Sequence, residues 1–350
     1  MRALTVQPGR AGSARLDELP EPPVEEGAVL VRTLAVGVCG TDAEIVSGRY
    51  GWAPHGKERL IIGHESLGIV ESAPAASGLE VGDLVVGIVR HPDPVPCTSC
   101  AAGEWDMCRN GLYTEHGIKE LSGFCADRFR MEREFLVRLT PALASVGVLL
   151  EPTSILVKAW DHIERIGSRA HWKPVRVLVT GAGPIGLLAA LLAARRGLEV
   201  HVFDRERDGP KPALVRALGA HYHVGALADV LAGAPPDIVL ECTGVPRIVL
   251  DVVSGSARAA VVCLVGVSAA GRRIVVDAGE LNREIVLEND AVFGSVNANR
   301  AHYEAAARIL AGGDGAWLGA LISRRVPLAS WAKAFERQPH DIKVVIDFAP

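Results

Sequence analysis

The segment from Val175 to Asp204 constrains the fold of this chain more than any other part of the sequence. It begins with an apolar β run, Val177–Val179, which leads into the glycine turn Gly181-Ala182-Gly183-Pro184-Ile185-Gly186. An alanine- and leucine-rich stretch follows, and then a second β run that ends at Asp204. This order of strand, GxGxxG turn, helix and second strand is that of a dinucleotide-binding βαβ unit, in which the final acid binds the hydroxyls of an adenosine ribose.

Each glycine of the turn has its own expected role. Gly181 permits the tight turn, Gly183 lets the backbone approach a pyrophosphate, and Gly186 lets helix and strand pack closely. Pro184 and Ile185 open the helix, whose free N–H groups and positive dipole end favour phosphate. The alternative is a glycine turn in an unrelated α/β domain, but the flanking elements and the acid at the right distance favour a dinucleotide site.

Charge and composition exclude several other functions. The run Val177–Ala194 has no charge over eighteen residues, which is near the lower limit for a membrane span, but its glycines and proline divide it into a strand and a short helix. The net charge is −4, from 37 basic and 41 acidic residues, so we expect no nucleic-acid partner and no membrane partner. The N-terminus lacks an apolar signal segment, and seven cysteines in such a chain favour metal ligands and free thiols over disulfides. We therefore expect a cytoplasmic protein.

The part of the chain after the glycine turn alternates strands with helices, which predicts an α/β fold with a doubly wound parallel sheet. Further strands are expected at Ala220–Val224, Asp237–Cys242 and Ala259–Val267. Glycine turns close two of these strands at the predicted cofactor edge. We expect the cofactor to contact Thr243, Gly266 and Val267 there.

A first group of metal-ligand side chains lies in the N-terminal part. Cys39, His64 and Glu65 stand at the ends of β segments, where neighbouring strands can bring them together. Thiolate, imidazole and carboxylate are ligand types that zinc binds. Taken singly, each residue is more often a buried thiol or an ordinary structural side chain, so the hypothesis depends on the group.

A second group lies in an irregular polar loop. Cys97 and Cys100 form a CxxC pair, and Cys108 follows eight residues later. Structural zinc normally takes four protein ligands, so a fourth is missing from this pattern. His91, Glu104 and Asp106 lie within reach, but Asp93 is the preferred fourth ligand because it stands just upstream of the pair. The alternative is three free thiols in a loop without a metal.

Taken together, these motifs resemble the zinc-dependent medium-chain dehydrogenase/reductase family over nearly the whole chain. The resemblance rests on the order of the Cys39 run, Gly63-His64-Glu65, the cysteine loop, Glu151-Pro152 and the glycine turn. Within that family the chain is most similar to glucose 1-dehydrogenase-like members. The resemblance implies a Rossmann dinucleotide-binding domain at 156–295 and a mostly β, GroES-like catalytic domain at 1–155 that residues 296–350 return to complete.

The resemblance also implies roles for individual residues. A catalytic zinc would be bound by Cys39, His64 and Glu151, with Glu65 either a ligand or a neighbour of the ligands. Thr41 would stand beside the reacting hydroxyl and pass its proton outward. Glu115 would bind a sugar hydroxyl, and Asn297 would lie near nicotinamide and substrate. The cysteine loop would hold a structural zinc, and the protein would be a homo-oligomer, a dimer or a tetramer.

The sequence departs from the family pattern at two places. The first of the usual four cysteines is absent from the loop. Ser122 stands where related sugar dehydrogenases often have His. Cofactor choice is also open, because Asp204 favours NAD by repelling a 2′-phosphate, whereas Arg205 and Arg207 just beyond it could bind one. NAD is the preferred cofactor.

The predicted reaction is transfer of a hydride from C1 of an aldose such as glucose to NAD(P), which gives a lactone. The same chemistry on a polyol, an inositol-like ring or an amino alcohol is the nearest alternative. A zinc-free reductase of the same fold would not need Cys39, His64 and Glu151 together. A dinucleotide-binding sensor without catalytic activity is the alternative from another class.

Overall fold

The computed structural model describes residues 1–268, 271 and 273–348. The chain forms two compact units, a first made of Met1–Ser154 with Asn297–Pro350 and a second made of Ile155–Val296. These divisions lie one residue from the predicted boundaries at 155/156 and 295/296. A helix, α3 (Leu150–Gly167), runs from the first unit into the second.

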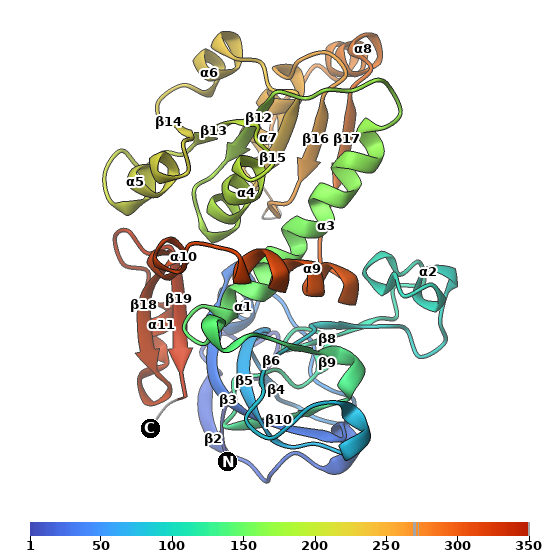
Figure 1. Cartoon of the computed structure of the whole chain (residues 1–350), viewed down its shortest axis with the longest axis vertical. Coiled ribbons are helices and arrows are strands. Elements are labelled where there is room, and N and C mark those ends of the chain that lie inside the picture. Colours follow the sequence, from blue (N-terminus) through green and yellow to red (C-terminus); the bar gives the residue numbers. More distant parts are fainter. Residues whose placement is uncertain (269–270, 272, 349–350) are drawn as a thin grey trace. The chain divides into compact units, whose positions relative to one another are not determined.

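The second unit is built on a six-stranded parallel sheet in the order β14-β13-β12-β15-β16-β17 (Figure 1). The strands are β12 (Arg176–Thr180), β13 (Glu199–Phe203), β14 (His221–His223), β15 (Ile238–Glu241), β16 (Val261–Leu264) and β17 (Ala291–Gly294). The chain winds from β12 to one edge and then starts again at β15 on the other side of β12. Such a reversal is where open parallel sheets bind their ligands. The predicted doubly wound sheet is confirmed.

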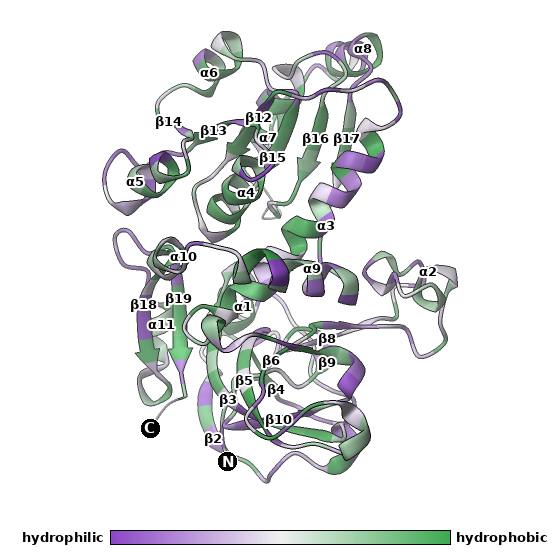
Figure 2. Cartoon of the chain, in the orientation of Figure 1, coloured by the Kyte–Doolittle hydropathy of each residue, from purple (hydrophilic) through white to green (hydrophobic). Residues whose placement is uncertain are grey.

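Helices cover this sheet because its strands are apolar on both faces. Successive side chains of a strand point to opposite faces, and both Val177 and Leu178 of β12 are buried. The helices are α4 (Pro184–Ala194), α5 (Pro210–Ala217), α6 (Leu227–Gly233), α7 (Pro246–Ser254) and α8 (Ala278–Glu288). Figure 2 shows hydrophobic colour along the central strands and α4. An apolar cluster joins Leu178 and Phe203 to Leu231 and Val252 of α6 and α7.

The first unit is mostly β. Its main sheet has the order β11-β6-β5-β3-β19-β18, with β10 paired to β3, and two small sheets have the orders β2-β1-β4 and β7-β8-β9. The strands are β1 (Arg2–Val6), β2 (Arg15–Glu18), β3 (Val29–Val38), β4 (Leu60–Ile61), β5 (Glu65–Ser72), β6 (Leu84–Gly87), β7 (Arg90–His91), β8 (Thr114–His116), β9 (Glu120–Leu121), β10 (Arg128–Met131), β11 (Leu136–Arg138), β18 (Ile322–Pro327) and β19 (Lys343–Asp347). The helices are α1 (Gly40–Val46), α2 (Thr98–Ala101), α9 (Arg300–Ala311), α10 (Gly315–Leu321) and α11 (Ala332–Phe335). Since β19 pairs antiparallel with β3, the C-terminal segment returns to the sheet that the N-terminal segment begins.

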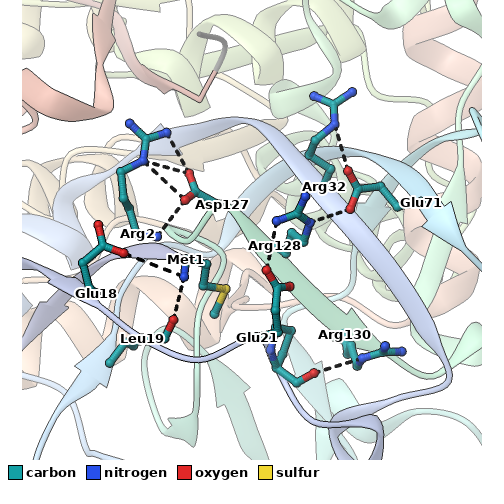
Figure 3. A network of polar contacts seen from close by, with 11 residues as sticks. Met1, Arg2, Glu18, Leu19, Glu21, Arg32, Glu71, Asp127, Arg128 and Arg130 are labelled. Carbon is teal, nitrogen blue, oxygen red and sulfur yellow. Dashed lines mark hydrogen bonds and ion pairs between the residues drawn. The ribbon is translucent and has the colours of Figure 1, made fainter.

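Charged side chains cross-link strands that are distant in sequence (Figure 3). Glu71 of β5 pairs with Arg32 of β3 at 3.2 Å and with Arg128 of β10 at 2.6 Å. Arg2 of β1 pairs with Asp127, next to β10, at 2.8 Å. These pairs are partly exposed, and such pairs each contribute at most about 1 kcal/mol to stability. The Glu71 pairs join β5 to β3 and β10, and the Arg2 pair joins β1 to the residue before β10.

Within the described part of the chain, no helix combines the length and the apolar character that a membrane crossing requires.

Candidate active site and cofactor site

Cys39 and His64 meet at the end of the central strand pair of the first unit. Cys39 follows β3, and His64 precedes β5, which pairs with β3 so that Gly37 lies opposite Glu65. Cys39 Sγ lies 3.1 Å from His64 Nε2. Two such ligands around a tetrahedral zinc are about 3.6 Å apart. The antiparallel pairing therefore makes the contact that the spacing of these residues predicted.

Asp42 holds the Cys39 backbone and the His64 ring in place. It lies in the first turn of α1, where its carboxylate accepts a hydrogen bond from the Cys39 backbone N–H at 2.9 Å. Its other oxygen is 3.2 Å from His64 Nδ1, which leaves Nε2 as the ring nitrogen directed at Cys39. Burial acts to lower the pKa of His64, but Asp42 and Cys39 outweigh burial and hold that pKa well above its ordinary value. An acid on Nδ1 is the usual partner of a metal-binding histidine.

Glu65 is bound by a lysine from the far end of the chain. Lys343 Nζ of β19 donates to both carboxylate oxygens of Glu65 at 2.6 Å and to the Val38 carbonyl at 3.2 Å. Both side chains are almost fully buried. Gly37 makes room for the carboxylate, since a Cβ there would lie 2.0 Å from Glu65 Oε2. Lys343 therefore neutralises a buried charge that would otherwise be costly.

Glu151 brings a second carboxyl group to this cluster. It lies near the start of α3, which begins at Leu150, so Pro152 occupies the third helical position. Burial raises the pKa of Glu151 to about 7, with Glu65 adding to the effect and His64 opposing it. A carboxyl group in that condition gains from a nearby cation, which would favour its ionised form.

The donor set of this cluster fits a zinc ion. The Cys39 sulfur, a His64 ring nitrogen and a Glu65 oxygen all lie within 4.8 Å of one another, and Glu151 is close enough to be affected by His64 and Glu65. One thiol, one imidazole and carboxylates are ligands found in zinc sites. Thr41 lies beside them on α1, half-buried, and its backbone N–H donates to Cys39 Sγ at 3.2 Å.

Glu115 and Asn297 are in direct contact, although 182 residues separate them. Asn297 Nδ2 donates to Glu115 Oε1 at 2.5 Å, and Arg90 donates to the same oxygen from Nε at 3.1 Å and Nη2 at 2.9 Å. Arg90 and Glu115 are each about 6% exposed. Because Glu115 Oε1 takes these bonds, its Oε2 is the oxygen left for another partner.

The cysteine loop gathers three thiols. Ligand atoms of Cys97, Cys100 and Cys108 lie within 4.8 Å of one another. The Cys97 and Cys100 sulfurs are 3.6 Å apart, close to the spacing of about 3.8 Å between two sulfurs on zinc. Backbone N–H groups of Arg109 and Cys100 lower the pKa of Cys97 to about 6, which favours the thiolate that binds metal.

The structure does not bring the Asp93 carboxylate into this group of thiols, among the residues that it describes. Its oxygens instead accept hydrogen bonds from Val95 N at 2.8 Å and Asn110 Nδ2 at 2.7 Å. Its backbone N–H, and not its carboxylate, is directed at Cys100. The prediction that Asp93 supplies the fourth ligand therefore has no support in this geometry.

Ser122, the second departure from the family pattern, supports a buried histidine through its backbone. The Ser122 carbonyl is 2.6 Å from His116 Nδ1. Because a carbonyl oxygen only accepts, Nδ1 carries the proton. The Nε2 lone pair of His116 is then buried without a hydrogen-bond partner among the described residues. Burial lowers the pKa of His116 to about 4.

In the second unit the glycine turn has the geometry of a phosphate site. Gly181 has φ +87°, and a Cβ at Gly186 would lie 1.7 Å from the Gly181 carbonyl oxygen. A Cβ at Gly183 would meet nothing within 4 Å, so that position presents open backbone. Pro184 is the first residue of α4 and Ile185 the second, so the free N–H groups of the helix lie at the turn.

Asp204 connects this turn to the end of β13. Its carboxylate accepts hydrogen bonds from Ala182 N at 2.6 Å and Glu206 N at 2.9 Å. Arg205 and Arg207, which follow it, are exposed. The structure thus places the predicted ribose acid against the predicted pyrophosphate turn.

Glu241 organises the neighbouring cofactor loops. It ends β15 and is fully buried. Its carboxylate accepts hydrogen bonds from Thr180 Oγ1 at 3.2 Å, Thr243 N at 2.8 Å and Gly244 N at 3.1 Å, and also from the Thr243 hydroxyl. Gly244 and Gly266 pack backbone to backbone, since a Cβ on Gly266 would lie 2.2 Å from Gly244 N. Val267, which follows, is 82% exposed.

Comparison with known families agrees with this geometry. Residues 144–348 match the family model described as glucose dehydrogenase C-terminus, and residues 25–141 match the alcohol dehydrogenase GroES-like domain. The chain belongs to the glucose dehydrogenase family of zinc-dependent medium-chain dehydrogenases. The resemblance inferred from the motifs is confirmed, as is the combination of a Rossmann sheet with a GroES-like domain.

Individual members of the glucose dehydrogenase family align over the full chain. The glucose 1-dehydrogenase of Methanocella arvoryzae is 38% identical over 358 residues, which cover 99% of each chain. That of Thermoproteus tenax is 38% identical over 352 residues, again 99% of each. The solved Haloferax mediterranei glucose dehydrogenase, in complex with NADP, Zn and gluconolactone, superposes with a TM-score of 0.92 at 34% identity over 100% of both chains. The chain described here is therefore an NAD(P)-dependent zinc dehydrogenase that acts on CH–OH groups.

Three residues that position the sites of this glucose dehydrogenase family member were not assigned roles from the sequence: Asp42, Lys343 and Glu241. Asp42 stands in the Cys39 motif, three residues after the thiol, where a capping acid is expected in the first turn of a helix. Glu241 is the last residue but one of the predicted strand Asp237–Cys242, beside a Thr-Gly turn, so the sequence already placed it near the cofactor edge. Lys343 had no local signal, because only the pairing of β19 with β3 brings it to Glu65.

Proposed function

We propose that this protein oxidises C1 of an aldose such as glucose, with transfer of a hydride to NAD(P) and formation of the lactone. The observation that carries the proposal is the group of half-buried Cys39 and buried His64, Glu65 and Glu151, whose donor types suit zinc. The two relatives named above, both glucose 1-dehydrogenases, support the substrate class.

The catalytic zinc would be held by Cys39, His64 and Glu151, and it would supply a Lewis acid that polarises the reacting oxygen. Glu65 is bound on both oxygens by Lys343, so we assign it to the support of this site. Asp42 fixes the His64 ring with Nε2 toward the metal position.

The remaining steps belong to the protein's own groups. The Thr41 hydroxyl, on the first turn of α1, accepts the proton of the substrate hydroxyl at Oγ1 and passes its own proton toward solvent. The C1–H bond then breaks with its electron pair, which moves as hydride to C4 of the nicotinamide. Glu115 Oε2 accepts a hydrogen bond from a sugar hydroxyl, and Asn297, whose amide holds Glu115 Oε1, lies near the nicotinamide and the substrate.

For the cofactor, the proposed contacts are Gly181, Gly183, Pro184, Ile185 and Gly186 with the pyrophosphate, and Thr243, Gly266 and Val267 at the adjoining loops. We propose NAD as the preferred form, since the buried Asp204 carboxylate stands where a 2′-phosphate would be placed. Arg205 is the contact that would bind a phosphate if NADP is used. The Haloferax mediterranei enzyme is named as a complex with NADP, so the preference requires a direct test.

Three further features belong to the proposal. A structural zinc would be held by Cys97, Cys100 and Cys108. A homo-oligomer, a dimer or tetramer, is supported by exposed apolar side chains on α8 and on the edge strand β17, namely Val286, Leu287 and Val292. A cytoplasmic location is supported by the cysteines, all of which lie in the described part of the chain and are free thiols.

The test is a matrix of substrates and cofactors. Glucose and other aldoses, sorbitol, myo-inositol and an amino alcohol are each assayed with NAD and with NADP. We expect the highest kcat/KM with an aldose and NAD, and lactone as the product. Turnover of a polyol with no aldose activity would replace the substrate proposal, and a higher kcat/KM with NADP would overturn the cofactor preference. Cofactor binding with no turnover on any of these compounds would indicate a sensor.

A further inference from the structure

A cluster of imidazoles lies on the edge of the parallel sheet, and nothing in the proposed reaction uses it. The edge strand β14 has the sequence His221-Tyr222-His223, and it pairs in parallel with β13 so that His201 lies opposite His221. Side chains alternate between the faces of a strand, so Glu199 shares a face with His201, and His223 shares it with His221. Three imidazoles and a carboxylate thus meet on one face of two neighbouring strands.

The distances within this cluster match those of a metal site. His201 Nε2 lies 3.1 Å from Glu199 Oε1, close to the separation of about 3.3 Å between two nitrogen or oxygen ligands on tetrahedral zinc. Ligand atoms of Glu199, His201 and His221 all lie within 4.8 Å of one another. His201 is buried and His221 is exposed, so the group combines a fixed ligand with an accessible one.

Neighbouring residues orient both of the fixed ligands. A carboxylate oxygen only accepts, so without a metal His201 Nε2 carries the proton that it donates to Glu199 Oε1. A metal ion would displace this proton, and His201 could then donate from Nδ1 to His223 Nε2, 2.9 Å away. Arg176 Nε donates to Glu199 Oε2 at 3.0 Å, which leaves Oε1 directed at His201. A hydrogen-bond acceptor on the other nitrogen of a histidine is the usual arrangement around a bound metal.

We propose that Glu199, His201 and His221 form a binding site for a divalent transition-metal ion such as Zn²⁺, with His223 as the residue that positions His201. Two imidazoles and one carboxylate leave a fourth position for water. The site lies in the second unit and shares no residue with the predicted catalytic or cysteine-loop groups. It would fasten the three-residue edge strand β14 to β13.

The site also touches the predicted cofactor acid through the backbone. The Asp204 N–H donates to the His223 carbonyl at 3.0 Å, so the metal-bound strand would hold the residue that follows β13. A metal ion here would therefore reduce the opening of β14 and steady Asp204. The expected signature is slower amide hydrogen exchange in 221–223 and at Asp204 when Zn²⁺ is added.

The test is a count of bound zinc by equilibrium dialysis of the full-length enzyme against Zn²⁺. The key variant is His221→Asn, because His221 is exposed and we expect its replacement to leave the fold intact. His171→Asn, an exposed histidine of the same unit, is the matched control. We expect the wild type and His171→Asn to bind one zinc more per chain than His221→Asn, while all three keep the same activity.

A second variant separates a ligand role from a positioning role. His223→Gln should keep the zinc count at saturation but weaken zinc affinity by about 10- to 100-fold. The inference is overturned if His221→Asn binds as many zinc ions as the wild type, or if His171→Asn loses the same ion. Unchanged hydrogen exchange in β14 after zinc addition would contradict the fastening of the edge strand. None of these outcomes depends on the identity of the sugar substrate.

Discussion

The buried His116 imidazole makes the stability of this protein depend on pH in a way that one substitution removes. Its Nδ1–H donates to the Ser122 carbonyl, while the Nε2 lone pair is buried without a partner among the described residues. A proton on Nε2 would therefore be a buried charge with nothing to bind it. Burial lowers the pKa of His116 to about 4 in the folded protein, against about 6.5 in an unfolded chain.

The sign and size of the effect follow from these two values. The unfolded chain binds the proton first as pH falls, so the stabilising contribution is complete above about pH 6.5 and is lost progressively down to about pH 4. Between pH 7.5 and pH 5.5 the free energy of unfolding falls by about 1.4 kcal/mol from this residue alone. His116→Asn keeps an N–H near Ser122 but does not titrate, so its stability should lack this change.

The assay is urea unfolding followed by tryptophan fluorescence at pH 7.5 and pH 5.5. Whatever His116→Asn costs at pH 7.5, the deficit relative to the wild type should shrink by about 1.4 kcal/mol at pH 5.5. His171→Asn, which alters an exposed imidazole, should show the same difference from wild type at both values. A deficit for His116→Asn that stays constant within about 0.5 kcal/mol would refute the argument that this histidine is buried as the neutral form.

The remaining predictions concern the sites. Cys39→Ala should lose one zinc per chain and all sugar oxidation, whereas Cys242→Ala should keep both. Metal analysis and the NAD(P)H assay measure these two properties, and a Cys39→Ala variant that stays active and keeps its zinc would contradict the zinc assignment. Glu241→Gln should raise the KM for the cofactor at least tenfold and lower the free energy of unfolding by about 1–3 kcal/mol. The reason is that the Gln amide N–H would face the backbone N–H donors of the loop, which the carboxylate now accepts. An unchanged KM for the cofactor would count against the role of Glu241 in shaping the cofactor loops. Arg90→Met should lower the free energy of unfolding by about 3–5 kcal/mol, since it leaves the Glu115 carboxylate buried without its cation. The double variant with Glu115→Gln should recover part of that loss. If the stability losses of the two single variants simply add in the double variant, the pair does not interact.

The sequence predicted the parts of this protein that depend on residues close together in the chain. The glycine turn, α4 and β13 are contiguous, and the GxGxxG spacing is imposed by contacts within the segment itself, such as Gly186 against the Gly181 carbonyl. The family resemblance and the parallel sheet, which also rest on motifs that are contiguous in sequence, are confirmed. Strand ends were less accurate. The expected strand Ala259–Val267 is shorter in the structure, at Val261–Leu264, because the ladder ends where Gly266 turns against Gly244.

The missing parts depend on contacts between distant segments. Asp93 as the fourth ligand of the cysteine loop stays a prediction; its oxygens accept hydrogen bonds from Val95 N and Asn110 Nδ2, contacts that the sequence did not show. The contact of Glu115 with Asn297 and the imidazole cluster of β13 and β14 arise from tertiary packing and from strand register, and register is not visible in a short apolar run. The roles of individual catalytic residues stay predictions.

The Glu65–Lys343 pair also dictates an order of events during synthesis. Lys343 follows Glu65 by 278 residues, so a ribosome adding 5–20 residues per second needs roughly a quarter of a minute to a minute to supply it. Throughout that interval the Glu65 carboxylate has no cation to accompany it into the core. The whole second unit, Ile155–Val296, emerges within the same interval. We expect the dinucleotide-binding unit to fold first on the nascent chain, and the catalytic unit to close around its metal site only when its last strand is released.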